Sequence, residues 1–217
     1  MPDYAAQRHT MVALQILADG VTDERLLASF RDVPRERFVP AEKRSVAYAD
    51  APIELVHKRW LLEPRTFSKL LQLAEIRPSD SVLDVGCTTG YSTAVLAKIA
   101  RRVVGLEEDA DLVRIASDTL RETGILNASI AQGALVEGNR AGAPFDVIII
   151  EGAIEQTPQK LLAQLAEGGR MVAISRRDAQ GHAILFLKEP DRLGRRIAFD
   201  AWAPVLSGFR QPAGFMF

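Results

Sequence analysis

The alternation of apolar and polar positions divides the chain into two regions of different character. In the first region, apolar residues recur at helical spacing over 7–18, 24–30 and 64–76, and no strand pattern of note interrupts them. A proline-punctuated segment, 33–40, predicts an irregular connector within this region. The sequence therefore predicts an α-rich N-terminal region over residues 1–78.

From residue 79 onward, short apolar runs alternate with amphipathic stretches. The runs predict strands at 81–85, 102–106, 128–131, 146–150 and 170–175, and the stretches predict helices at 91–99, 109–123 and 157–166. Strands that alternate with helices favour right-handed crossovers and a parallel sheet. Two later runs, 183–187 and 195–202, flank a Pro- and Gly-containing loop and predict an antiparallel pair at the sheet edge. The segment from Pro204 to Phe217 is expected to be irregular.

These patterns predict an α/β fold. Residues 79–217 are expected to form a Rossmann-like domain whose sheet is mostly parallel, with an antiparallel strand near the C-terminus. The α-rich region over 1–78 precedes this domain, and we expect the two regions to form one compact unit.

Composition and charge narrow the class of protein. The chain is 47% hydrophobic and 25% charged, which is an ordinary globular balance, and its net charge of −1 favours no nucleic-acid or membrane partner. Cys87 is the only cysteine and the three histidines match no metal spacing, so we expect neither an internal disulfide nor a metal. The N-terminus lacks a signal-peptide layout, and no apolar run approaches the ~20 residues of a membrane helix. We therefore expect a cytoplasmic protein, and the sequence leaves its oligomeric state open.

The segment Val82–Tyr91 carries the clearest chemical signal. An apolar run ends at Asp84-Val85, the chain turns through Gly86 and Gly90, and a helical pattern follows. Glycines let the backbone approach a ligand closely, and the start of a helix presents unpaired N–H groups. The segment therefore predicts a nucleotide-binding turn.

Glu107 supplies a second part of the same signal. It ends the next apolar run, where an acidic side chain accepts hydrogen bonds from two ribose hydroxyls. The turn is not the G-x-G-x-x-G of dinucleotide binders, because Thr88 stands where the middle glycine is expected. This difference disfavours a dehydrogenase.

Several segments resemble the successive motifs of class I S-adenosylmethionine-dependent methyltransferases: Val82–Tyr91, Glu107, 144–149 and 165–172. Segments 33–40, 47–52 and 90–97 together resemble the protein-L-isoaspartate O-methyltransferase family, and the likeness runs from about residue 10 to residue 190. The resemblance implies S-adenosylmethionine as cofactor and a carboxylate of a damaged protein or peptide as methyl acceptor.

The resemblance also implies roles for individual residues. Asp84 would support the loop or hold the methionine end of the cofactor, and Gly86, Thr88 and Gly90 would pass beneath it. Glu107 would accept the ribose hydroxyls. The segment 133–135, with Gly133 and Ala134, would border the adenine. The cofactor-binding residues implied by the resemblance are therefore Asp84, Gly86, Thr88, Gly90, Glu107, Gly133 and Ala134.

The chain departs from the family in the segment Lys58–Pro64. The family pattern there is Gly-x-Thr-x-Ser-x-Pro, whereas Trp60 stands at the threonine position and Leu62 at the serine position. Leucine cannot donate a hydrogen bond to a substrate carboxylate, and an unmade buried bond costs roughly 1–3 kcal/mol. Two further departures are Ala134, where the family commonly has an acid, and Glu151, where a small or hydroxyl residue is expected.

These departures leave three hypotheses open. The first is a methyltransferase of the isoaspartyl type, the second a catalytically silent relative with a binding or regulatory role, and the third a methyltransferase for another acceptor. No catalytic residue is assigned. The weak candidates are His57 as a general base, Trp60 as a lid over the cofactor and Glu151 as a ligand for an amine acceptor.

Overall fold

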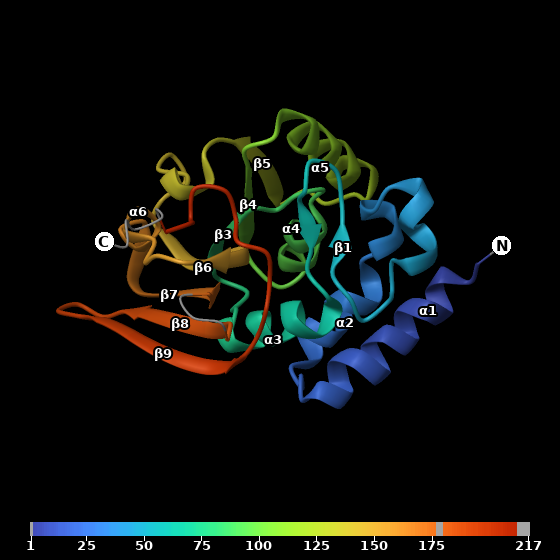
Figure 1. The fold of residues 1–217 in the computed structure, drawn as a ribbon, viewed down its shortest axis with the longest axis horizontal. Helices are drawn as coiled ribbons and strands as arrows, with labels where there is room; N and C mark the ends of the chain where they lie inside the picture. Colours follow the sequence, from blue (N-terminus) through green and yellow to red (C-terminus); the bar gives the residue numbers. More distant parts are fainter. Residues whose placement is uncertain (1, 177–179, 212–217) are drawn as a thin grey trace, which may run out of the picture.

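A computed structural model describes residues 2–176 and 180–211, and it contains a seven-stranded sheet (Figure 1). The strands are β3 (Ser81–Val85), β4 (Arg102–Glu107), β5 (Ala128–Gln132), β6 (Phe145–Ile154), β7 (Leu165–Ser175), β8 (His182–Lys188) and β9 (Leu193–Asp200). Their order across the sheet is β5-β4-β3-β6-β7-β8-β9. The first five are parallel, and β8 runs antiparallel to both of its neighbours. The expected α/β fold, with one antiparallel strand near the C-terminus, is confirmed.

Helices bury both faces of the sheet. They are α1 (Tyr4–Met11), α2 (Glu24–Asp32), α3 (Pro64–Ala74), α4 (Tyr91–Ala97), α5 (Ala110–Glu122) and α6 (Gln159–Leu162). Val147 and Ile149 of β6 pack with α1 to α4, whereas Ile148 and Ile150 pack with α6 on the opposite face. This alternation explains why β6 is almost wholly apolar, as a strand covered on both sides must be. Within the described ranges, no helix is long and apolar enough to span a membrane.

Two predicted helices are shorter than their patterns indicated. The pattern over 7–18 is α-helical only as far as Met11, after which a π turn and a 3₁₀ turn lead to Gly20, whose φ is +88°. The helix predicted over 157–166 is wrong at its end, because Leu165 pairs with Phe145 and begins β7. Leu165 therefore serves the sheet although its spacing from Leu161 is helical.

The N-terminal region contains a short hairpin that the sequence pattern did not predict. Its strands are β1 (Ile53–Glu54) and β2 (Trp60–Leu61), paired antiparallel. Two residues per strand are too few to show an alternation of apolar and polar residues, so the sequence gives no signal for these strands. The connector 33–40 is irregular as expected, with a 3₁₀ turn over Arg35–Phe38.

The chain after β9 returns across the carboxyl end of β6. The N–H of Ala153 donates to the carbonyl of Pro204 at 2.9 Å, and the N–H of Leu206 donates to the carbonyl of Ala153 at 3.0 Å. Apart from a single bridge between Val205 and Ala153, the segment is irregular up to residue 211, as predicted. The rest of that prediction, 212–217, lies outside the described residues.

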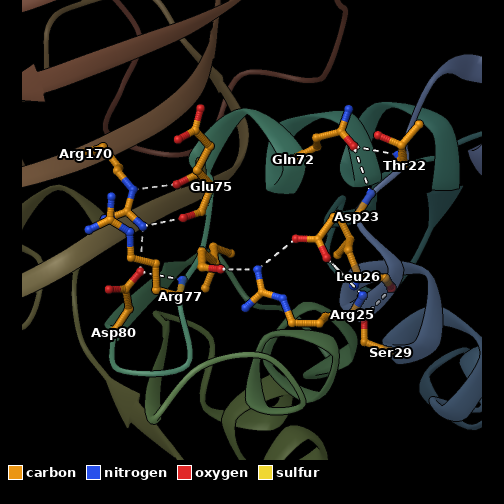
Figure 2. A network of polar contacts seen from close by, with 12 residues as sticks. Thr22, Asp23, Arg25, Leu26, Ser29, Gln72, Glu75, Arg77, Asp80 and Arg170 are labelled. Carbon is orange, nitrogen blue, oxygen red and sulfur yellow. Dashed lines mark hydrogen bonds and ion pairs between the residues drawn. The ribbon is translucent and has the colours of Figure 1, made fainter.

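A polar network fastens the N-terminal region to the base of the sheet (Figure 2). Arg170 of β7 donates to the carbonyls of Ala74 and Glu75 at the end of α3, at 2.5 and 2.6 Å, and to the carboxylate of Asp80 at 2.6 Å. Arg25 of α2 donates to the carbonyl of Ile76 at 3.1 Å. Arg170 thereby satisfies carbonyls that the end of a helix leaves unpaired.

We expect Arg170→Ala to lower the free energy of unfolding by about 3 kcal/mol, because it strands the nearly buried Asp80 carboxylate and two carbonyl groups. Denaturant unfolding followed by circular dichroism measures the change. Arg192→Ala is the control, since Arg192 pairs with Glu189 in solvent and its loss should cost less than about 0.5 kcal/mol. A loss below about 1 kcal/mol for Arg170→Ala would contradict this account of the joint.

Candidate functional site

The turn after β3 is held by the neighbouring strand β4. The backbone N–H groups of Gly86 and Cys87 both donate to the carbonyl of Leu106, at 2.8 and 3.2 Å. Gly86 and Gly90 have φ values of 83° and 90°, which glycine adopts without steric cost. Thr88 shares the left-handed conformation at φ 51°, so all three predicted cofactor positions of the turn lie in one tight bend before α4.

Asp84 lies at the end of β3 and is fully buried. Its Oδ2 accepts hydrogen bonds from the hydroxyls of Ser92 and Thr93 in α4, at 2.7 and 2.6 Å, and so ties the strand to the first turn of the helix. Burial raises the pKa of Asp84 to about 6, against the opposing effect of these hydroxyls. These hydrogen bonds let Asp84 support the loop. A contact between Asp84 and the methionine end of the cofactor stays a prediction.

Glu107 ends β4, and its carboxylate is also fully buried. Its Oε1 accepts hydrogen bonds from Nη1 of Arg59 at 2.6 Å and from the N–H groups of Glu108 and Asp109 at 2.9 and 3.2 Å. Its Oε2 accepts from the N–H of Thr88 at 3.0 Å. Oε1 therefore has three donors, one more than its two lone pairs, whereas Oε2 has one donor among the described residues.

Arg59 places its guanidinium over the glycine turn. A Cβ added to Gly86 would lie 3.0 Å from Nη2 of Arg59 and 3.2 Å from Cδ1 of Leu206. The Arg59 side chain is only 10% exposed, and its Nε and Nη2 atoms are buried without a hydrogen-bond partner among the described residues. The ion pair with Glu107 is therefore its principal anchor.

The loop that carries Arg59 has an unusual backbone. His57 and Lys58, between β1 and β2, have φ values of 54° and 58°, a conformation that costs roughly 1–2 kcal/mol for a residue with a side chain. The carboxylate of Asp109 accepts a hydrogen bond from Nδ1 of His57, which holds the pKa of Asp109 below its usual value. The N–H of Arg59 donates to the carbonyl of Val56 at 3.0 Å and closes the loop.

A cavity of about 510 Å³ lies beside Arg59, between this loop and the chain that returns over β6. Its lining includes His57, Lys58, Trp60, Leu62, Glu151 and Arg210. The three weak catalytic candidates, His57, Trp60 and Glu151, are therefore brought to one cavity. His57 lies at its rim, more than half exposed, and Glu151 lies at its buried wall.

Glu151 is buried with one carboxyl oxygen unpartnered among the described residues. Burial raises its pKa well above the usual range, and the nearby charge of Asp84 adds to the rise, while Arg35 opposes it. The neutral acid is therefore favoured over a wide pH range. A neutral carboxyl group can donate a hydrogen bond to an acceptor oxygen, which a carboxylate cannot do.

Arg35 supports the backbone of the segment Lys58–Pro64, in which the chain departs from the family. It is fully buried, donates to the carbonyl of Ala47 at 2.8 Å and to the carbonyl of Leu62 at 2.7 Å, and stacks over the ring of Tyr91 at 4.6 Å. Arg35 therefore fixes the backbone of Leu62, whose side chain lines the cavity.

Gly133 and Ala134 follow β5 at the same edge of the sheet. The N–H of Gly133 donates to the carbonyl of Glu107 at 3.0 Å, and Ala134 precedes a 3₁₀ turn over Leu135–Glu137. The cavity beside Arg59 is not lined by either residue. Their place beside Glu107 suits the border of a bound nucleoside, and a contact with adenine stays a prediction.

A family model described as Protein-L-isoaspartate(D-aspartate) O-methyltransferase (PCMT) matches residues 7–193. The chain belongs to this family. PCMT proteins are S-adenosylmethionine-dependent methyltransferases, so the sequence-based recognition of the family is confirmed.

Bacterial relatives and solved structures agree with this assignment. A protein-L-isoaspartate O-methyltransferase of Koribacter versatilis is 39% identical over 169 residues, covering 78% of this chain and 76% of the relative. One of Rhodopseudomonas palustris is 34% identical over 207 residues, covering 93% and 95%. A solved protein-L-isoaspartate O-methyltransferase superposes with a TM-score of 0.82 at 23% identity, covering 93% of this chain and 66% of that chain, which supports the fold.

Two site residues of this PCMT protein escaped the sequence reasoning. The sequence favours solvated side chains for Lys58 and Arg59, with a role in holding an acidic partner as the less favoured alternative. This expectation is wrong for Arg59, which is buried against the carboxylate of Glu107. Arg35 belongs to a motif, 33–40, that the resemblance uses only as a whole. A signal for each existed, because an arginine next to an expected cofactor or substrate segment is a candidate partner for a buried acid. Which acid each one meets depends on the path of a loop, and the sequence does not encode that path in any periodic pattern.

We expect Glu151→Gln to change the pH dependence of stability in this PCMT protein. Because folding raises the pKa of Glu151, the neutral carboxyl group contributes its full share of stability below pH ~4.3, and this stability is lost as the pH rises through the folded-state pKa. Glutamine stays neutral at every pH and loses nothing. Relative to wild type, the variant should therefore gain stability as the pH rises from 4 to 8. Urea unfolding at each pH measures the difference.

The control for this measurement is Glu167→Gln, which alters an exposed carboxyl group near the start of β7. Its stability difference from wild type should stay flat across the same pH range. A flat difference for Glu151→Gln would contradict the buried, neutral state of that residue.

Proposed function

We propose that this protein transfers a methyl group from S-adenosylmethionine to a carboxylate of a damaged protein or peptide, of the isoaspartyl type. One observation carries the proposal beyond family membership. The cavity lined by Trp60 and Glu151 lies directly beside the glycine turn and Glu107, where a donor and an acceptor would meet. The proposal rests on that adjacency together with the family match over residues 7–193.

The residues at the edge of the sheet fit the cofactor in chemical type. Glu107 supplies a carboxylate for ribose hydroxyls, Gly86 supplies a backbone with no side chain, and Gly133 with Ala134 supplies a small border for adenine. One residue interrupts this fit, since the guanidinium of Arg59 lies over Gly86 and binds Glu107. Binding of the cofactor therefore requires Arg59 to move.

When bound, S-adenosylmethionine supplies an electrophilic methyl group. A carboxylate acceptor is already the nucleophile at neutral pH and needs no general base, so positioning contributes most of what the protein must provide. This makes a basic His57 unnecessary for a carboxylate. The task left to the cavity is to hold the acceptor in line with the methyl group and to exclude water.

The charges of the cavity suit a carboxylate acceptor. Lys58, Arg59 and Arg210 place positive charge in its lining, against the carboxylate of Glu108 there and the pairing of Arg59 with Glu107. The raised pKa of Glu151 favours its neutral form, which adds a donor rather than a repelling charge. Trp60 and Leu62 provide apolar surface in place of the family hydroxyls. We infer that charge replaces hydroxyl hydrogen bonds in holding the acceptor.

A second function is favoured by the same residues. With Trp60 and Leu62 in the hydroxyl positions and Arg59 on Glu107, a catalytically silent relative with a binding or regulatory role also fits. Methylation of another acceptor through Glu151 or His57 is the remaining alternative. Measured turnover distinguishes the isoaspartyl methyltransferase from the silent relative. Competition between the isoaspartyl peptide and other acceptors identifies a methyltransferase for another acceptor.

The coarser features of the protein complete the proposal. We propose that residues 1–78 form a helical substrate or lid region beside an S-adenosylmethionine-binding domain over residues 79–217. We also propose a cytoplasmic location, a protein or peptide partner, and no nucleic-acid or membrane partner, in keeping with the net charge of −1.

The direct test incubates the protein with methyl-labelled S-adenosylmethionine and two peptides that differ only in one isoaspartyl or aspartyl linkage. We expect base-labile label on the isoaspartyl peptide alone, because methyl esters hydrolyse in base. If calorimetry shows that S-adenosylhomocysteine binds but no methyl group is transferred to the isoaspartyl peptide, the silent relative is supported instead.

Restoring the family hydroxyls should raise activity. Trp60→Thr combined with Leu62→Ser offers the acceptor two hydroxyl donors, each worth about 1 kcal/mol, so kcat/KM for the isoaspartyl peptide should rise at least about tenfold. Val56→Thr is the control, since Val56 is exposed in the same hairpin loop. An unchanged or lower kcat/KM in the double variant, with folding intact, would show that the cavity does not hold a carboxylate at these positions.

A further inference from the structure

The side chain of Arg59 competes for the position that a nucleoside ribose would take. Its Nη1 lies 2.6 Å from Oε1 of Glu107, and its Nη2 lies 3.0 Å from the position that a Cβ on Gly86 would take. The ribose acid and the glycine turn are thus both covered by one guanidinium. No other described side chain touches both, according to the contacts of Glu107 and Gly86.

The hydrogen bonds of Glu107 make the competition direct. Three donors converge on Oε1 and one on Oε2, and three of the four are backbone N–H groups that the turn and α5 hold in place. Withdrawal of Arg59 removes the third donor from Oε1 and uncovers the carboxylate, so that a ribose hydroxyl can take its place.

Two features of the structure oppose the buried position of Arg59. Two of its nitrogen atoms, Nε and Nη2, are buried with no partner among the described residues, which is costly for a charged group. The loop behind it holds His57 and Lys58 in left-handed conformations. The ion pair of Arg59 with Glu107 and the hydrogen bond between His57 and Asp109 oppose this strain, so removing the ion pair favours release of the loop.

We propose that the loop from Val56 to Trp60 is an internal cap on the cofactor site, closed by the Arg59–Glu107 ion pair and opened when the cofactor ribose takes Glu107. The inference rests on the proposed function, because it takes S-adenosylmethionine as the cofactor. It assigns to Arg59 the role of setting cofactor affinity, which the family match does not assign.

The test compares binding of S-adenosylhomocysteine to wild type and to Arg59→Gln by calorimetry. The variant removes the competing cation, so we expect its Kd to be at least about tenfold lower than that of wild type. Arg65→Gln is the matched control, because Arg65 pairs with Asp50 on the surface, outside the cavity, and its Kd should equal that of wild type.

A second variant and a second measurement guard against misfolding. Arg59→Lys keeps a positive charge near Glu107 without the planar fork of arginine, so its Kd should fall between those of wild type and Arg59→Gln. In wild type, hydrogen exchange should speed up over residues 55–60 when S-adenosylhomocysteine binds, while the amides of Gly86 to Tyr91 become protected.

Three results would overturn the cap. They are weaker binding in Arg59→Gln, which would make Arg59 a ligand of the cofactor, protection of residues 55–60 on binding, and failure of both proteins to bind. None of these readouts depends on methyl transfer. Loss of transfer to the isoaspartyl peptide alongside tighter binding in Arg59→Gln would contradict the proposed acceptor and support the cap.

Discussion

Three acidic side chains meet where neighbouring parallel strands end, and the site depends on how their charge is balanced. Asp84, Glu107 and Glu151 lie in the carboxyl-terminal halves of β3, β4 and β6 and are all buried. Two buried guanidinium groups, of Arg35 and Arg59, face them from the N-terminal region. The sheet therefore supplies the negative charge and the N-terminal region supplies the positive charge, which joins the two regions electrostatically as well as through their shared core.

The sheet was predictable because a strand that is buried on both faces appears in the sequence as a continuous apolar run. The apolar run of β6 and the glycines at 86 and 90 mark a covered strand and a tight turn wherever they lie in the fold. Dependence on such local patterns also explains the errors. Leu165 carries helical spacing but pairs in the sheet, and the two-residue strands of the hairpin leave no periodic pattern.

The site was predictable only as far as each residue acts through its own element. Glu107 ends a strand, so its place could be predicted from the pattern. His57, Trp60 and Glu151 line one cavity, and a catalytic role for any of them stays a prediction. The contact between Arg59 and Glu107 joins residues 48 positions apart through a loop with left-handed backbone. Neither composition nor periodicity encodes such a path, and so the interaction that covers the turn needed coordinates.

The chain that returns over β6 has a consequence for how the protein is made. Leu206 packs against Gly86 and Gly152, so the cover of the glycine turn is synthesised some 120 residues after the turn itself. Because domains generally fold as they emerge, a nascent chain that has completed β3 to β7 has Arg59 over the turn but lacks the packing of Leu206. Completion of the site is therefore coupled to translation of the segment after β9, and a chain that ends before Leu206 leaves one side of the glycine turn uncovered.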